Sequence, residues 1–95
     1  MIAEAIRRQV RVGLRYRPTD AVERIVEPHV LWRTTSDNAC LFCLQVVSEI
    51  GTSENDPKHL DPYQMTSIRI TDEPFDVDPV FKRNIYENII AVVAR

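Results

Sequence analysis

The stretch of this chain that most constrains its fold is residues 40–47, CLFCLQVV, an apolar run that only Gln45 interrupts. A strand projects successive side chains to opposite faces, and here both sets of alternate positions are apolar. Such a strand is typically covered on both sides, so we predict that it lies in the middle of the fold. Cys40 and Cys43 are then packing residues, and their i, i+3 spacing on a strand directs the two thiols to opposite faces.

The two cysteines also form a C-x-x-C pair, which occurs in zinc sites and in thioredoxin-type redox proteins. Zinc needs four ligands, and neither His29 nor His59 is spaced as a partner for the pair. A reactive thiol of the redox type lies at a helix N-terminus, and nothing predicts a helix start at Cys40. The acidic stretch 72–78 lacks the spacing and the glycine of a calcium loop. We therefore expect no metal ion and no cofactor.

Sequence motifs for catalysis are missing. The chain has no G-x-S-x-G, no P-loop and no glycine-rich dinucleotide turn, and it contains only two glycines. Glu27 and His29 lie two residues apart on an expected strand, which is a weak arrangement for acid–base chemistry. We therefore expect no catalytic residues and a protein that is not an enzyme.

The first third of the chain shows a helical turn followed by strand patterns. Residues 2–8, IAEAIRR, are good helix formers with an apolar face and predict a short helix. Residues 10–17, VRVGLRYR, alternate strictly and predict a strand with one apolar face and one arginine face. A second strand is expected from about residue 22 to residue 35. Pro28 lies inside it and predicts an edge position, a bend or a bulge.

The second half of the chain is less regular. Residues 48–62 are rich in polar residues, glycine and proline, and predict a loop, while a strand is expected around residues 68–70. Residues 80–95 carry apolar residues near helical spacing and predict an amphipathic helix. The prediction is a single domain over residues 1–95. It is mainly β, a small, strongly bent antiparallel sheet or barrel, with a short N-terminal helix and a C-terminal helix.

Charge is unevenly distributed along the sequence. Residues 1–36 carry seven arginines against four acidic residues, whereas residues 37–81 carry nine acidic residues against two basic ones. If the first two strands pair, the arginine face of residues 10–17 can converge with Arg24 and Arg33. The planar guanidinium fork suits a phosphate, a nucleotide or an acidic peptide. The alternative is a solvated strand face that resists aggregation at the sheet edge.

Three segments of the chain resemble the WYL domain of bacterial regulators. They are residues 5–18, AIRRQVRVGLRYRP, residues 24–32, RIVEPHVLW, and residues 65–75, MTSIRITDEPF. In this alignment CLFCLQV takes the place of the tripeptide that names the family. Residues 60–64, LDPYQ, take the place of the family's F-R-L-D-R, so two arginines of the family's ligand site are replaced. The chain is most similar to the short, free-standing members.

The resemblance implies a small Sm- or SH3-like β-barrel that senses or binds a ligand, often a nucleotide or nucleic acid, in transcription regulation. Arg24 and His29 are the polar groups that the match carries over toward a ligand. Together with the arginine pattern, this makes Arg15, Arg24, His29 and Arg33 our predicted contacts with an anion.

The alternative function is a protein interaction module without a small ligand. A domain of 95 residues leaves much of its surface uncovered. In this version the C-terminal helix makes a homodimer, or contacts a regulatory partner, through Ile85, Ile89 and Val92. No run approaches the ~20 apolar residues that a membrane span needs, and residues 1–10 do not read as a signal peptide. We therefore expect a cytoplasmic protein without a membrane partner.

Overall fold

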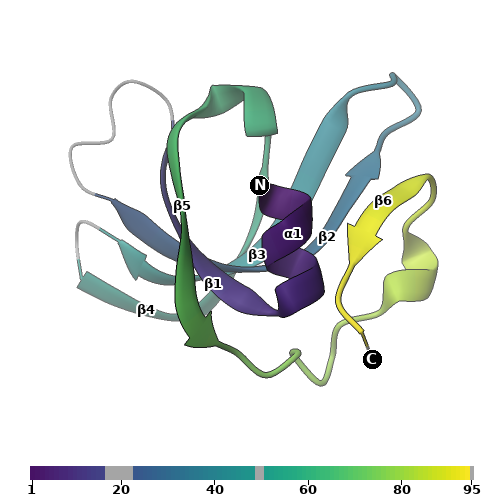
Figure 1. Ribbon diagram of the computed structural model, residues 1–95. Helices are drawn as coiled ribbons and strands as arrows, with labels where there is room; N and C mark the ends of the chain where they lie inside the picture. The colour runs from purple at the N-terminus through teal and green to yellow at the C-terminus, as the bar shows by residue number, and fades with distance from the viewer. Residues whose placement is uncertain (17–22, 49–50, 95) are drawn as a thin grey trace.

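The sheet of this protein is built from antiparallel strands that follow one short helix. The computed structural model describes residues 1–16, 23–48 and 51–94 (Figure 1). The helix is α1 (Ile2–Arg8), and two single 3-10 turns follow later, η1 (Pro62–Gln64) and η2 (Arg83–Ile85). The six strands are β1 (Val10–Tyr16), β2 (Arg24–Arg33), β3 (Ala39–Ser48), β4 (Gly51–Leu60), β5 (Met65–Pro74) and β6 (Ile89–Val92). The prediction of a mainly β fold with an N-terminal helix is confirmed.

Strand β2 organises the sheet because it pairs with three neighbours. The strand order is β4-β3-β2-β1-β5, and β6 pairs with β2. Strand β1 pairs with the beginning of β2, with Val12 opposite Val26, and β6 pairs with its end, with Val92 opposite Val30. Between these two pairings the register against β3 shifts from Pro28 to Val30, so His29 is the extra residue of a bulge. The irregularity that Pro28 predicted is confirmed.

The hydrophobic core lies between α1 and the bent sheet. Figure 1 shows α1 lying across the middle of the sheet, with β6 beside it. Strand β3 lies between β2 and β4, as the apolar run predicted. Leu41 and Cys43 are fully buried on one face of β3, and Leu44 is buried at the alternate position. The core also takes residues from α1, β1, β2, β4, β6 and the segment after β5, among them Ile6, Val12, Val26, Leu60, Phe75 and Ala91.

Hydrogen bonds connect the end of α1 to the end of β5. Gln9 ends the helix in the left-handed conformation, with φ at 56°. Its side-chain Nε2 donates to the Phe75 carbonyl at 2.7 Å, and the Phe75 amide donates to the Gln9 carbonyl at 3.2 Å. Thr71 Oγ1 donates to the Arg11 carbonyl at 2.7 Å, where the β1–β5 register is irregular. These bonds satisfy backbone groups that the irregular pairing leaves open.

Two predictions for the second half of the chain are wrong. Residues 80–94, the described part of the predicted C-terminal helix, do not form a helix: η2 and β6 occupy this segment, and β6 fills the edge of β2 that β1 leaves free. The β-branched residues of β6 pack well on a sheet. The spacing of apolar residues in so short a run does not by itself distinguish a helix from a strand. Most of the predicted loop 48–62 is a strand, because β4 covers residues 51–60 and pairs with β3, with Leu60 opposite Leu41. Among the described residues, no helix is long and apolar enough to cross a membrane.

Candidate functional site

Arg11, on the arginine face of β1, forms ion pairs within the chain. Arg11 Nε donates to Glu27 Oε2 at 3.0 Å, and Arg11 Nη1 lies 3.5 Å from Glu73 Oε2. Glu27 is only 6% exposed, so its charge is compensated mainly by Arg11. Glu73 belongs to the acidic stretch 72–78 and lies near the end of β5. The basic and acidic segments of the chain thus meet at this face.

Further along β1, Gly13 lies under a second ion pair. The Glu23 carboxylate accepts from Arg69 Nε at 3.2 Å and from Arg69 Nη2 at 2.7 Å. A Cβ atom on Gly13 would come within 2.5 Å of the Glu23 carboxylate, so the missing side chain makes room for this pair. The hydrogen bond from Arg69 lowers the pKa of Glu23 below its usual value. Arg15 lies next to this pair on the exposed face of β1.

The four residues predicted to contact an anion do not come together. Arg33 lies nine residues from Arg24, at the other end of β2, and pairs with Asp37 at 3.5 Å. His29 has no exposed surface, and its two ring nitrogens bond the Glu27 carbonyl and the Asp78 amide. It is a structural residue, directed inward by the bulge in β2. Of the four, Arg24 alone lies in the polar group described next.

A group of polar side chains gathers where β1 ends and β2 begins. Arg24 Nη1 donates to Gln45 Oε1 on β3 at 3.1 Å, and the Arg24 guanidinium carbon lies 5.4 Å from the centre of the Tyr16 ring on β1. Tyr16 Oη accepts from the Asp61 amide at 3.0 Å. Lys58 on β4 is the register partner of Cys43 on β3, and its side chain is half-buried. We call Tyr16, Arg24, Gln45 and Lys58 the Arg24 cluster.

Lys58, the register partner of Cys43, and Arg24 are the two cations of this cluster, and both act on the buried Cys43 thiol. Burial raises the pKa of Cys43 to about 12, while the positive charges of Arg24 and Lys58 act in the opposite direction. Gln45 is buried and orients the guanidinium through its amide oxygen, and the Tyr16 ring supports it by a cation–π contact. An oriented guanidinium with an ammonium nearby is suited to bind a phosphate or carboxylate.

Sequence reasoning found this cluster only in part. Arg24 was a predicted contact, and Tyr16 lies in the first of the three segments that resemble the WYL domain. Lys58 was missed because residues 48–62 were assigned to a loop. Gln45 had a signal in the sequence, since it is the one polar residue in the apolar run of β3. A polar side chain in such a run needs a partner, and Arg24 supplies it.

The two cysteines lie in different surroundings and form no disulfide. Cys43 is fully buried and Cys40 is half-buried, and burial raises the pKa of both thiols. Among the described residues, no group of three or more His, Cys, Asp or Glu side chains is arranged to hold a metal ion.

Cys43 is expected to resist alkylation in the folded protein. A pKa of about 12 in place of 9.0 reduces the thiolate fraction at about pH 8 by a factor of about a thousand. The measurement is the rate of iodoacetamide labelling of Cys40→Ser, which retains Cys43 alone, with and without urea. The matched variant for comparison is Cys43→Ser, which retains Cys40 alone. Labelling of folded Cys40→Ser at the rate of the unfolded chain would contradict the buried placement of Cys43.

Comparisons of this chain with models of protein families, with curated proteins and with solved structures give no match. The function of the chain is therefore inferred from the contacts of its own residues and from its sequence patterns.

Proposed function

We propose that this chain is a non-enzymatic binding domain that holds an anionic ligand, a nucleotide or a nucleic acid, at the Arg24 cluster. The observation that carries the proposal is the placement of Arg24. Its half-buried guanidinium is oriented by a neutral amide and an aromatic ring, with Lys58 on β4 acting on the same buried region. Arg11, Arg33 and Arg69 lie outside this cluster, and each faces a carboxylate of the chain.

The chemistry of the cluster and the WYL resemblance support the same class of ligand. A guanidinium held in one orientation donates two parallel hydrogen bonds to a phosphate at low entropic cost. The Tyr16 ring adds an aromatic surface next to the cation. The resemblance adds the regulatory context, and we propose that the domain acts as a ligand sensor in the reducing interior of a bacterial cell.

Replacing Arg24 with methionine is expected to weaken binding of a nucleotide or a short single-stranded oligonucleotide by about tenfold or more, the effect of losing a charge-assisted hydrogen bond. Binding is measured by fluorescence anisotropy with labelled ligands at low salt, and wild-type affinity should fall as salt rises. The matched control is Arg33→Met, because Arg33 is exposed, paired with Asp37 and outside the cluster. Equal affinities of the Arg24→Met protein and the wild type would refute the proposal.

A second candidate function, self-association, has its own observation. Ile85, Ile89 and Ile90 are 68%, 36% and 39% exposed, an unusual amount of apolar surface for one short segment. Within the described part of the chain, β6 pairs only with β2, so its other edge can accept a further strand. Val92, the third residue predicted at a dimer interface, packs instead against the core of its own chain.

If this surface joins two copies, Ile89→Asp is expected to convert a dimer to a monomer, since a buried unpaired charge at an interface costs several kcal/mol. Sedimentation velocity measures the change. Val80→Asp is the control, because Val80 is also exposed and apolar but lies outside β6. A wild-type protein that sediments as a monomer at concentrations of about 100 μM would exclude this candidate.

A further inference from the structure

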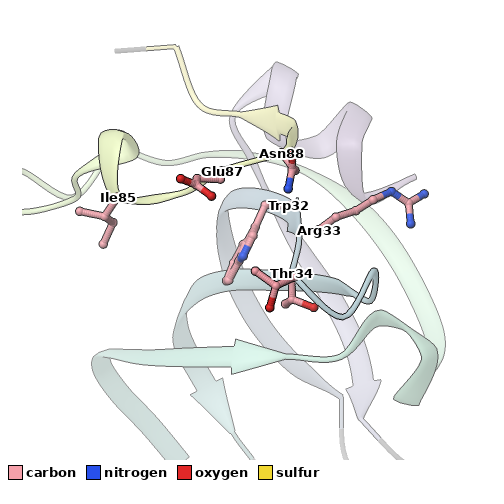
Figure 2. Close-up of a pocket in the computed structure, with 7 residues that line it drawn as sticks. Trp32, Arg33, Thr34, Ile85, Glu87 and Asn88 are labelled. Carbon is pink, nitrogen blue, oxygen red and sulfur yellow. The ribbon is translucent and has the colours of Figure 1, made fainter.

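A small pocket lies at the end of β2 opposite to the Arg24 cluster. It has a volume of about 180 Å³ and opens between the β2–β3 turn and the segment that leads from η2 into β6 (Figure 2). Its lining includes Trp32, Thr34, Ile85 and Glu87. Pockets for drug-sized ligands have volumes of roughly 300–1,000 Å³, so this one has room for the end of a single side chain rather than for a whole nucleotide.

The walls of the pocket are held in place by the surrounding structure. The Trp32 ring packs against Tyr86, with ring centres 4.6 Å apart, and meets His59 edge-on at 5.8 Å. The Arg33 amide donates to the Asn88 carbonyl at 3.1 Å, which joins the two sides of the pocket. Its aromatic wall and its backbone frame are therefore formed before any ligand enters.

One carboxylate, that of Glu87, belongs to a residue that lines the pocket. Among the described residues, no hydrogen bond or ion pair involves the Glu87 carboxylate. Arg33 also lines the pocket, but its guanidinium reaches away from the other labelled residues and pairs with Asp37 at 3.5 Å (Figure 2). The pocket is thus lined by an indole-bearing residue and by a glutamate whose carboxylate has no partner in the described part of the chain.

These features together select a cation. Trp is the strongest cation–π partner among the aromatic side chains, and a carboxylate adds a charge-assisted hydrogen bond to a guanidinium or ammonium group. We infer that this pocket receives the cationic end of an arginine or lysine side chain from a protein partner. Ile85, which is 68% exposed at the pocket, offers an apolar contact to the residues that flank this side chain in the partner.

The inference is independent of the Arg24 cluster, since Arg24 and Arg33 lie at opposite ends of β2. One site binds an anion and the other a cation, so substitutions separate the two. The Arg24→Met protein is expected to keep the pocket intact and to bind a basic peptide as the wild type does.

The experiment uses the fluorescence of Trp32, which is the single tryptophan of the chain. The full chain is titrated with acetyl-arginine amide, with a short peptide carrying one arginine between apolar residues, and with the same peptide carrying citrulline. We expect the arginine peptide to change the emission and to bind at least about tenfold more tightly than the citrulline peptide, which keeps the shape and loses the charge. Glu87→Gln should reduce this preference to about twofold or less. The exposed carboxylate of Glu4 on α1 is the control, and Glu4→Gln should bind as the wild type does.

Three results would overturn the inference. Equal binding of the citrulline and arginine peptides would show that the pocket does not recognise charge. Unchanged binding by Glu87→Gln would show that this carboxylate is not the contact. Acetyl-arginine amide binding as tightly as the peptide would identify the ligand as a small guanidinium compound, not a partner's side chain. Because Glu87 is exposed, its replacement is not expected to impair folding, and an unchanged thermal midpoint checks this.

Discussion

Replacing His29 with alanine is expected to lower the free energy of unfolding by about 3–5 kcal/mol, enough to unfold a marginally stable domain of this size. The His29 ring has no exposed surface and lies against Phe42, Phe75 and Phe81. Its Nε2 accepts from the Asp78 amide at 3.1 Å, and its Nδ1 lies 2.9 Å from the Glu27 carbonyl. An amide only donates and a carbonyl only accepts, so the neutral ring carries its proton on Nδ1.

The cost of this substitution has two physical sources. Alanine leaves the Asp78 amide and the Glu27 carbonyl without their partner, and each unsatisfied buried group costs about 1–3 kcal/mol. It also leaves a cavity among the three phenylalanine rings. Urea denaturation measures the change, and the matched control is His59→Ala, whose ring is exposed on β4 and which should cost less than about 1 kcal/mol. Similar losses from both substitutions would contradict the structural role of His29.

The same histidine makes stability depend on pH. Burial lowers the pKa of His29 below 6.5, while the Glu27 carbonyl and the charges of Glu27 and Asp78 oppose this effect. Below about pH 6.5 the unfolded chain therefore binds a proton that the folded chain excludes. The stabilisation is complete above this pH and is lost as the pH falls toward the lowered pKa, by at most about 1.4 kcal/mol per pH unit. His59→Ala should keep this dependence, and an NMR titration should find that the His29 ring takes up its proton at a lower pH than an ordinary histidine.

Replacing Arg11 with methionine is expected to lower the free energy of unfolding by about 2–3 kcal/mol, because it leaves the buried Glu27 carboxylate without its cation. The Arg11 side chain is 31% exposed, so water softens the effect relative to a fully buried pair. The pair of Arg11 with Glu73 adds little, since the Glu73 side chain is mostly exposed.

Two further variants test this explanation by denaturation in urea. Arg33→Met removes an ion pair whose side chains are 52% and 86% exposed, and it should cost less than about 0.5 kcal/mol. The double variant Arg11→Met with Glu27→Met should recover much of the loss, because it removes the unpaired buried charge. If Arg11→Met costs no more than Arg33→Met, the Glu27 carboxylate is stabilised by other means.

Local patterns in the sequence determined the first half of the fold. The alternation of residues 10–17 predicted β1, and the apolar run of residues 40–47 predicted β3 between two neighbours. Pro28 predicted the irregularity of β2, and the structure has its bulge there. These features depend on the faces and backbone geometry of neighbouring residues, which the sequence displays directly.

The second half of the fold was decided by partners distant in the sequence. Strand β6 forms because β2 offers it a free edge, and β4 forms because β3 supplies its partner, although its own sequence is polar. The spacing of apolar residues within β4 or β6 does not show that a neighbouring strand is available to pair with it. The expected C-terminal helix was wrong for this reason.

The sequence by itself therefore determined which segments carry a buried face and which residue types are available for binding. Only the tertiary structure decided where each functional group points. The bulge in β2 turned His29 inward, acidic side chains from distant segments neutralised Arg11 and Arg69, and Gln45 on β3 received Arg24. The reason is physical, because a side chain can bind a ligand only with the charge and hydrogen-bonding groups that its neighbours in the fold do not already use. Strand register determines which residues are neighbours, and a single bulge shifts that register.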